Sequence, residues 1–323
     1  MNAISRVVRR FDDVQQRTPV LAFPIAVVKK FGDDGAGKYT ALIAYFALFS
    51  MFPLLLVFSA ILGFVLRGNP ALRDDILHSA LAQFPIIGDQ IRTNLGALNG
   101  SGLALALGAL GALWGGLGVT QAMEDAMNTV WNVPMTRRPN ALKSRLRGLG
   151  FLVVLGAGTI AATVLGSFGG GSHAPAPLRA GAIAVAMVVN FGVFLAAFLL
   201  MNSERLKARQ VLPGAILATV FFQALQLIGG WYVDRQLRGA TQVYGFFAIV
   251  IGLLVWISLV AQFVLYAAEA NVVWCRHLWP RSLAQPPLTD SDKEVMARLA
   301  KMQKRRPEQE IDVSFGEGER RSS

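Results

Sequence analysis

The sequence contains one cysteine, Cys275, and three histidines, His78, His173 and His277. A single cysteine excludes an internal disulfide framework and a zinc site built from cysteines. The histidines lie far apart, and no HxHxDH spacing, GxSxG elbow or phosphate-binding loop is present. The residues therefore give no chemical support for a nuclease. Without a nucleotide-binding motif, the protein could transport a solute only along or against an existing gradient and not by nucleotide hydrolysis. We expect no cofactor, no metal and no enzyme activity.

Charged residues are also scarce. They make up 16% of the chain, whereas hydrophobic residues make up 54% and the mean hydropathy is +0.46. This composition is too apolar for a soluble domain and too evenly apolar for a single anchor, so it predicts an all-α, polytopic membrane protein. In a soluble protein the net charge of +11 would suggest a nucleic-acid partner. In a membrane protein, positive residues are needed in the cytoplasmic loops to set the topology, and this can account for the net charge. We therefore expect no nucleic-acid partner.

Six apolar runs without an internal Lys or Arg are long enough to cross a bilayer, which takes about 20 residues per helix. The predicted spans are about 41–66, 103–120, 148–168, 181–201, 211–230 and 244–268, within a transmembrane domain of residues 41–275. Residues 1–40 are predicted to be a cytoplasmic segment whose apolar run at 20–28 lies in the membrane interface. Residues 67–102 are predicted to form an extracytoplasmic loop with short amphipathic helices. The polar tail, 276–323, is expected to hold a helix within 289–306 and to be partly disordered.

Lysine and arginine are distributed unequally between the loops. The two chain ends and the loops after spans two and four hold 25 of the 31, and the other three loops hold 6. By the positive-inside rule, both chain ends are predicted to be cytoplasmic. The basic loops 137–147 and 203–210 are candidates for contact with anionic lipid head groups. The alternative is that their charges only set the topology.

The first span has a proline near its middle. Pro53 removes one backbone N–H and its ring pushes against the carbonyl of Phe49, while Ser50 offers a hydroxyl one turn earlier. We therefore predict a helix that is kinked at mid-membrane depth and that the other spans pack around. The second span carries a face of small residues that predicts close helix packing, with a sliding surface for conformational change as the alternative. This face consists of Gly108, Gly111, Gly115 and Gly118.

The sixth span carries a stripe of polar residues spaced by 4, 4 and 3, which places them on one helical face. The stripe consists of Ser258, Gln262, Tyr266 and Glu269. A carboxylate at mid-helix costs about 2.5 kcal/mol or more, so Glu269 is the first candidate for function. One interpretation is a substrate or proton path that ends at Glu269. The other is that Glu269 pairs with a loop arginine near the interface and the stripe joins helices.

A second set of candidates lies near mid-depth on three other spans. Gln223 and Gln226 belong to span five and Asn190 to span four. These amides could meet Tyr45 and Ser50 of span one around the proline break. Transporters bind polar substrate atoms at such places, beside an interrupted helix at the bilayer midplane. The alternative is a hydrogen-bonded network that fixes the register of the helices.

Two neighbouring carboxylates, Glu124 and Asp125, close span two on the predicted cytoplasmic side. Successive helical residues point about 100° apart, so they do not form a tight carboxylate pair. We expect each to bind a loop arginine such as Arg137 or Arg145. The interpretation is a cytoplasmic gate or a structural salt bridge rather than catalysis.

Four separate stretches, in this order, resemble the YihY/BrkB family of bacterial inner-membrane proteins. They are AYFALFSMFPLLLVFSAILGF, WGGLGVTQAMEDAMNTVWNV, LPGA and YGFFAIVIGLLVWISLVAQFVLYAAEAN. The resemblance covers roughly residues 30–275 and implies a bundle of six membrane spans in the inner membrane. That family usually has glycine before the Ala-Glu pair of the last stretch, whereas here Ala267 and Ala268 precede Glu269. We expect this change to be tolerated, because alanine also permits close helix packing.

What the resemblance implies for function is modest. Most members are uncharacterised; some carry an old ribonuclease label, some have a link to serum resistance, and some have been proposed to export lipids or other amphiphiles. The kinked first span and the mid-depth amides favour a secondary transporter or flippase-like exporter of an anionic or amphiphilic solute or lipid. The alternative is a non-transporting scaffold for envelope assembly. The expected partners are membrane lipids and an unidentified small-molecule or lipid substrate.

Overall fold

A computed structural model describes residues 3–65, 102–167, 175–232 and 246–316. Every regular element within these ranges is a helix, which confirms the all-α prediction. The elements are α1 (Ala3–Arg17), α2 (Pro19–Asp33), α3 (Ala36–Val65), α6 (Gly102–Val130), the 3-10 turn η1 (Met135–Arg137), α7 (Ala141–Ser167), α8 (Ala176–Leu200), α9 (Ala208–Tyr232), α11 (Phe246–Arg276) and α12 (Asp290–Met302). The predicted amphipathic helices of the loop 67–102 fall almost entirely outside the described residues, as does the end of the tail beyond residue 316.

Four of these helices are long and apolar enough to cross a membrane: α7, α8, α9 and α11. They coincide with the third to sixth predicted spans. The first two predicted spans coincide with α3 and α6, which are 30 and 29 residues long. The structure therefore supports a multi-pass helical protein, while the total of six crossings and the side on which the chain ends lie stay predictions.

α3 and α6 form an antiparallel pair whose close approach depends on glycine. A Cβ atom built on Gly115 would lie 2.4 Å from the Cβ atom of Ser50, and one built on Gly118 would lie 2.3 Å from the ring of Phe46. Real carbon atoms do not approach so closely, so a side chain at either position would push the two helices apart. The predicted close packing of this face is confirmed for Gly111, Gly115 and Gly118.

α3 continues as one helix through Pro53. The proline ring lies against Gly111 of α6. One turn earlier, the hydroxyl of Ser50 donates a hydrogen bond to the carbonyl oxygen of Ala47, at 3.0 Å. The bend that the sequence predicts at Pro53 stays a prediction.

The buried core lies at one end of the long helices. It is built from the first turns of α3 and α9 and the last turns of α6, α8 and α11. Its members include Ala36, Met127, Phe198, Val211 and Leu265. Toward the other end large apolar side chains are exposed, among them Leu54 (56%), Leu110 (65%), Leu227 (67%) and Ile251 (60%). We call these two regions the packed end and the open end.

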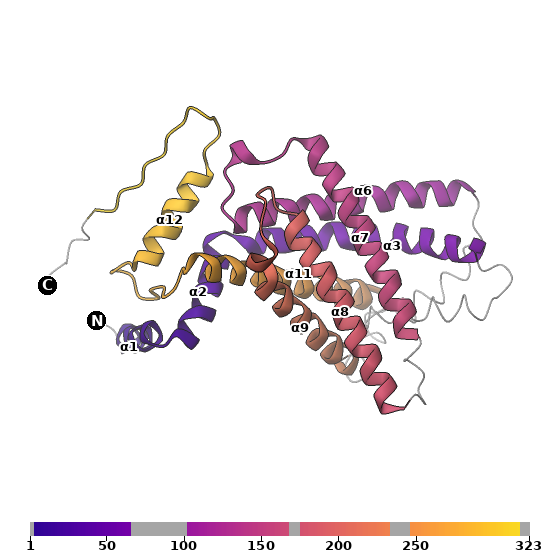
Figure 1. The fold of residues 1–323 in the computed structure, drawn as a ribbon, viewed down its shortest axis with the longest axis horizontal. Coiled ribbons are helices and arrows are strands. Elements are labelled where there is room, and N and C mark those ends of the chain that lie inside the picture. The colour runs from indigo at the N-terminus through magenta and orange to yellow at the C-terminus, as the bar shows by residue number, and fades with distance from the viewer. Residues whose placement is uncertain (1–2, 66–101, 168–174, 233–245, 317–323) are drawn as a thin grey trace.

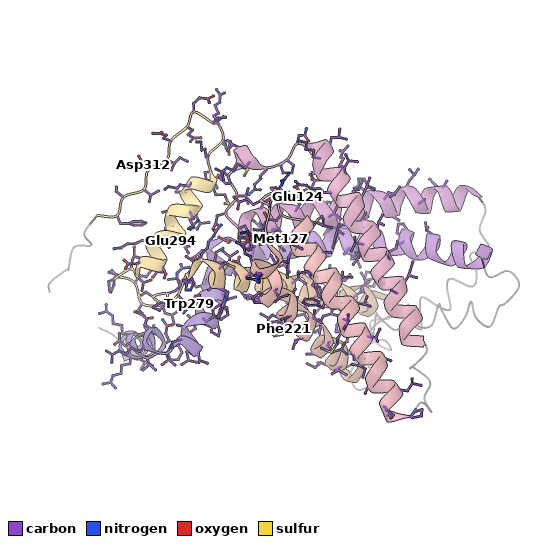
Figure 2. All side chains as sticks on the ribbon, viewed as in Figure 1. Glu124, Met127, Phe221, Trp279, Glu294 and Asp312 are labelled. Atoms are coloured by element: carbon purple, nitrogen blue, oxygen red, sulfur yellow. The ribbon has the colours of Figure 1, made fainter. Side chains whose placement is uncertain are left out.

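The ribbon shows the same asymmetry (Figure 1). The α3–α6 pair runs across the picture, whereas α7, α8 and α9 slant away from it beyond the packed end. Met127 and Glu124, less than one turn apart on α6, mark the packed end, and Phe221 on α9 lies farther along the slanting group (Figure 2). The described helices are thus joined at one end and diverge toward the other.

The N-terminal helices and the tail lie together at the packed end (Figure 1). α2 is continuous through Pro24, and its Ala26 and Val27 pack against Ala270 and Val273 of α11. The segment predicted to lie in the membrane interface is therefore bound to the end of a long helix. α12 confirms the helix predicted within 289–306. It begins with a capping box in which the side chains of Thr289 and Asp292 accept hydrogen bonds from each other's backbone N–H groups.

A buried ion-pair cluster as the candidate functional site

Lys30, in the last turn of α2, is completely buried. Its Nζ donates to Oδ2 of Asp34 at 2.5 Å, to Oε2 of Glu269 at 2.9 Å and to the carbonyl oxygen of Val130 at 2.7 Å. These three acceptors use all three N–H groups of the ammonium. The cluster therefore joins α2, α6 and α11 at the packed end. Glu269, which the sequence singles out, has a lysine of the N-terminal segment as its partner and not a loop arginine.

Two backbone turns bring these groups together. Gly35 has a φ of +61°, a left-handed conformation that glycine adopts without strain, and it joins α2 to α3 directly after Asp34. Asn132 has a φ of 53° and ends α6 in the same way, as asparagine can. Its side-chain amide donates to Oδ1 of Asp34 at 3.4 Å. The chain reversals after α2 and after α6 thus meet at one carboxylate.

Arg276, at the end of α11, supports this second turn. Its guanidinium donates to Oδ1 of Asn132 at 3.2 Å and to the carbonyl oxygen of Trp131 at 2.8 Å, and it lies over the Trp131 ring at 5.6 Å. Arg276 therefore orients the residues around the cluster through a neutral amide and a carbonyl. Neither carboxylate of the cluster is among these contacts.

The charge of Lys30 is held by its surroundings. Burial disfavours the ammonium, but the adjacent carboxylates Glu269 and Asp34 raise the pKa of Lys30 above its ordinary value. Lys30 also faces the C-terminal end of α6 through Val130 and lies in the last turn of its own helix. Helix C-termini carry partial negative charge, so both favour a cation here. Lys30 is therefore charged at neutral pH.

The polar stripe of α11 divides between two environments. Tyr266 and Glu269 face α2, where the Tyr266 ring stacks on Phe31 with centroids 4.2 Å apart. Gln262 and Ser258, one and two turns closer to the open end, are half-buried. The two residues at the packed end thus fix α2, and a path along Ser258 and Gln262 stays a prediction.

The mid-depth set is not assembled as the sequence predicts. Asn190 on α8 and Gln223 and Gln226 on α9 are half-buried on two helices that pack together. Ser50 instead lies against Gly115 of α6. Tyr45 is 48% exposed, and its ring contacts those of Phe46 and Phe49 on its own helix. Helix phase explains the difference, because α3 turns its Ser50 face toward α6.

Glu124 and Asp125 bind loop arginines, as the sequence predicts, but not those that it names. Glu124 accepts a hydrogen bond from the Ser144 hydroxyl at 2.5 Å and lies 3.6 Å from Arg147. Asp125 lies 3.7 Å from Arg138. The sequence predicts Arg137 and Arg145, and of these Arg137 lies 3.8 Å from Glu204. The two carboxylates anchor the loop between α6 and α7; a gating role stays a prediction.

The LPGA stretch meets the end of the last stretch. The N–H of Gly214 donates to Oδ1 of Asn271 at 2.6 Å, and a Cβ atom on Gly214 would lie 2.3 Å from Nδ2 of Asn271. One turn along α11, the thiol of Cys275 donates to the carbonyl oxygen of Gln210 at 3.4 Å. Pro213 interrupts the backbone hydrogen bonds of α9 here, and side chains of α11 provide the partners.

Sequence reasoning missed four residues of this end: Lys30, Asp34, Asn132 and Asn271. The available signals were the LPGA, WNV and AEAN stretches, which the fold brings together, and a lysine beside an apolar run. Within the described ranges, no group of three or more His, Cys, Asp and Glu residues is arranged to hold a metal ion.

Comparison with known proteins matches this chain to one family of membrane proteins. The family model described as virulence factor BrkB matches residues 27–288. Inner membrane protein YhjD of Escherichia coli (strain K12) is 24% identical over 279 residues, which cover 78% of this chain and 81% of YhjD. A UPF0761 membrane protein of Alkalilimnicola ehrlichii is 27% identical over 259 residues, which cover 76% of this chain but only 57% of that relative.

A Bacillus subtilis (strain 168) protein whose name describes it as ribonuclease-like, YfkH, is 24% identical over 74% of this chain and 90% of its own length. No solved structure matches the chain. Because the family model covers most of the sequence, from the α2 helix to beyond α11, the protein belongs to the BrkB family of membrane proteins.

Proposed function

We propose that this protein is a secondary transporter or flippase-like exporter that moves an anionic or amphiphilic solute or lipid across the inner membrane. The observation that carries the proposal is the asymmetry of the helices, which are joined at the packed end and diverge at the open end. Alternating access requires such a state, in which a bundle is closed on one side and open on the other.

The buried cluster is the natural element to hold the packed end closed. Lys30 joins three helices through two carboxylates and one backbone carbonyl, without exposure to solvent. Removal of one partner of a buried ion pair costs about 3–5 kcal/mol because the other charge is left buried and unpaired, so loss of Lys30 should destabilise the closed arrangement. Opening of this end would require separation of α2 from α11.

Anionic lipid head groups are the proposed partners of the N-terminal helix. α1 exposes Val7 (67%), Phe11 (50%) and Val14 (56%) along one face and carries Arg9 and Arg10 beside them. A helix with an apolar face and flanking arginines is typical of segments that lie on anionic membrane surfaces.

A single-cysteine accessibility experiment tests transport without knowledge of the substrate. Cys275→Ser gives a cysteine-free chain, into which Gln262→Cys is introduced on the predicted path. We expect a membrane-impermeant maleimide to label this cysteine from the open side in sealed vesicles, and from both sides after Lys30→Ala opens the packed end. Leu142→Cys is the positive control, because Leu142 is 67% exposed at the start of α7.

Flux is then measured with a fluorescent phosphatidylglycerol in proteoliposomes, using phosphatidylcholine with the same label as the zwitterionic control. We expect faster transbilayer movement of the anionic probe with protein present and a changed rate for Glu269→Gln. Failure to label Gln262→Cys from either side, together with probe movement equal to that in protein-free vesicles, would favour the scaffold alternative. The alternative has one observation in its favour, namely the folded unit formed by α1, α2 and α12.

A further inference from the structure

The buried cluster holds more negative charge than positive. Lys30 supplies one cation, whereas Asp34 and Glu269 supply two carboxyl groups, and all three side chains are buried. The two bonded carboxyl oxygens lie within about 5.4 Å of each other, because they accept from the same nitrogen at 2.5 and 2.9 Å. Two carboxylates that share a buried site do not both ionise readily, since each opposes the charge of the other.

The second oxygen of Glu269 gives an independent indication. Oε1 of Glu269 is buried and has no hydrogen-bond partner in the described part of the chain. A buried carboxylate oxygen without a donor is costly, because a charged acceptor there loses its water and gains nothing in return. A proton on this carboxyl group removes the charge and with it most of this cost.

The surroundings add negative partial charge to the cluster, and one further cation, Arg276, acts on Asp34 only across Asn132, without contact with either carboxylate. The C-terminal ends of α2 and α6, which carry partial negative charge, both point at the cluster. The other titratable groups that face it from the packed helices are already engaged. Tyr39 of α3 bonds Thr129, Arg138 bonds Val133 and pairs with Asp125, Arg276 bonds Asn132, and Tyr266 stacks on Phe31.

We infer that the Lys30–Asp34–Glu269 cluster is a proton-binding site, in which one proton is held by the two carboxyl groups while Lys30 remains charged. Release transfers this proton from a carboxyl oxygen to water and leaves a net charge of minus one between α2 and α11. The separation of these helices is then favoured, because the exposed carboxylate regains its hydration. That this proton is the coupling ion rests on the proposed transport function, whereas its binding does not.

Infrared spectroscopy of the full-length protein in lipid nanodiscs tests the binding directly. A protonated carboxyl group gives a C=O band apart from that of carboxylates, and the band shifts in deuterium oxide. We expect the neutral-pH spectrum of the wild type to contain one such band that disappears in both Glu269→Gln and Asp34→Asn. Each substitution leaves one carboxylate opposite one ammonium, so no proton is then required.

Two further variants make the test specific. Glu124→Gln is the matched control, because Glu124 is also buried and its Oε1 also lacks a hydrogen-bond partner, but Arg147 lies 3.6 Å from that oxygen and balances its charge one-to-one. Loss of Glu124 should therefore leave the band unchanged. Lys30→Met should increase the band, since both carboxyl groups then remain neutral. A wild-type spectrum without the band, or a band that survives in both Glu269→Gln and Asp34→Asn, overturns the inference. Neither outcome depends on whether the protein transports anything.

Thermal unfolding gives a second readout for any variant that is hard to measure spectroscopically. A proton held by the folded state but not by the unfolded chain stabilises the fold less as the pH rises. The wild-type melting temperature should therefore fall between mildly acidic and neutral pH, and Glu269→Gln and Asp34→Asn should each flatten this slope. An equal slope in the wild type and both variants would contradict the site.

Discussion

Lys29 and Lys30 are neighbours in the sequence but have separate partners. Lys29 bonds the carbonyl oxygen of Ser282 and pairs with Asp292 of the tail at 2.9 Å, whereas Lys30 enters the core and reaches Glu269. Successive side chains of a helix point about 100° apart, so one turns toward the tail and the other toward α11. The positive-inside rule treats the two lysines alike, and only the fold shows that one binds the tail and the other binds α11.

Gly214 is the residue at which a single methyl group should matter most. A Cβ atom there would lie 2.4 Å from the carbonyl oxygen of Ala267 and 2.3 Å from Asn271, and one of these two contacts is backbone. We expect Gly214→Ala to destabilise the protein by about 1–3 kcal/mol, the usual cost of overpacking. The loss should appear as a lower melting temperature in nanodiscs.

Gly192→Ala on α8 is the matched control, because a Cβ atom at Gly192 meets nothing within 4 Å. Alanine is also the better helix former, so this variant should be neutral or slightly more stable. Equal melting temperatures for Gly214→Ala and Gly192→Ala would show that α9 and α11 separate more easily than their contact indicates.

Single residues were only partly predictable from the sequence. Glu269 is identifiable because a carboxylate in an apolar run is costly wherever the helix lies. Its partner is not, since Lys30 is 239 positions away and nothing local marks which lysine turns inward. Ser50 is a candidate that the structure places elsewhere. Its polarity suggests a substrate contact, but the face of α3 on which it lies packs against Gly115.

At the scale of elements, the chain ends form one folded unit. Asp12 of α1 accepts hydrogen bonds from the backbone N–H groups of Leu283 and Ala284 at 2.9 and 3.1 Å. Arg281 joins Asp292 to Asp33 of α2, at 2.6 Å in both cases. The tail segment before α12 is therefore bound to α1 and α2 by partly buried, charge-assisted contacts, which are stronger than neutral ones.

Acid should detach this segment. Burial disfavours the Asp12 carboxylate, but hydrogen bonds from Leu283, Gln15 and Ala284 lower the pKa of Asp12 from 3.8 to about 2. Its contribution to stability is complete above pH 4 and is lost as the pH falls toward 2, because the unfolded segment takes up the proton first. In the Cys275→Ser background, fluorophores at Val14→Cys and Met296→Cys should move apart over this range.

Asp12→Asn should weaken the attachment already at neutral pH and reduce the change between pH 4 and pH 2. Asp13→Asn is the matched control, because Asp13 is the exposed neighbour of Asp12 and should leave the acid transition unchanged. A constant distance down to pH 2, with the helix content retained, would contradict a role for Asp12.

Helix positions were predictable where the sequence is strongly periodic or apolar. The glycine spacing on α6 indicated close packing because small residues three and four apart share a face. The capped helix α12 was predictable from its acidic start and basic end. The attachment of the tail to α1 was not, because a polar segment gives no periodic signal and its partners lie more than 260 positions away.

For the whole molecule, both chain ends are predicted on the cytoplasmic side. The structure places α1 and α12 at the same end of the molecule, which is consistent with an even number of crossings. We expect green fluorescent protein fused at either terminus to fluoresce, and alkaline phosphatase inserted in the loop 67–102 to be active, because that enzyme folds only outside the cytoplasm. Fusions that place the termini on opposite sides would contradict the six-span topology.

The contact between Lys30 and Glu269 also constrains the order of biosynthesis. Lys30 emerges from the ribosome early, but its carboxylate partner on α11 is made 239 residues later. Until α11 is inserted, the ammonium can bind Asp34 and the end of α6 but lacks Glu269, and α2 lacks its contact with α11. A chain truncated before α11 would therefore leave α2 only partly attached, a defect that cellular quality control can recognise. The packing of the N-terminal helices is therefore completed only after the last membrane segment has been made.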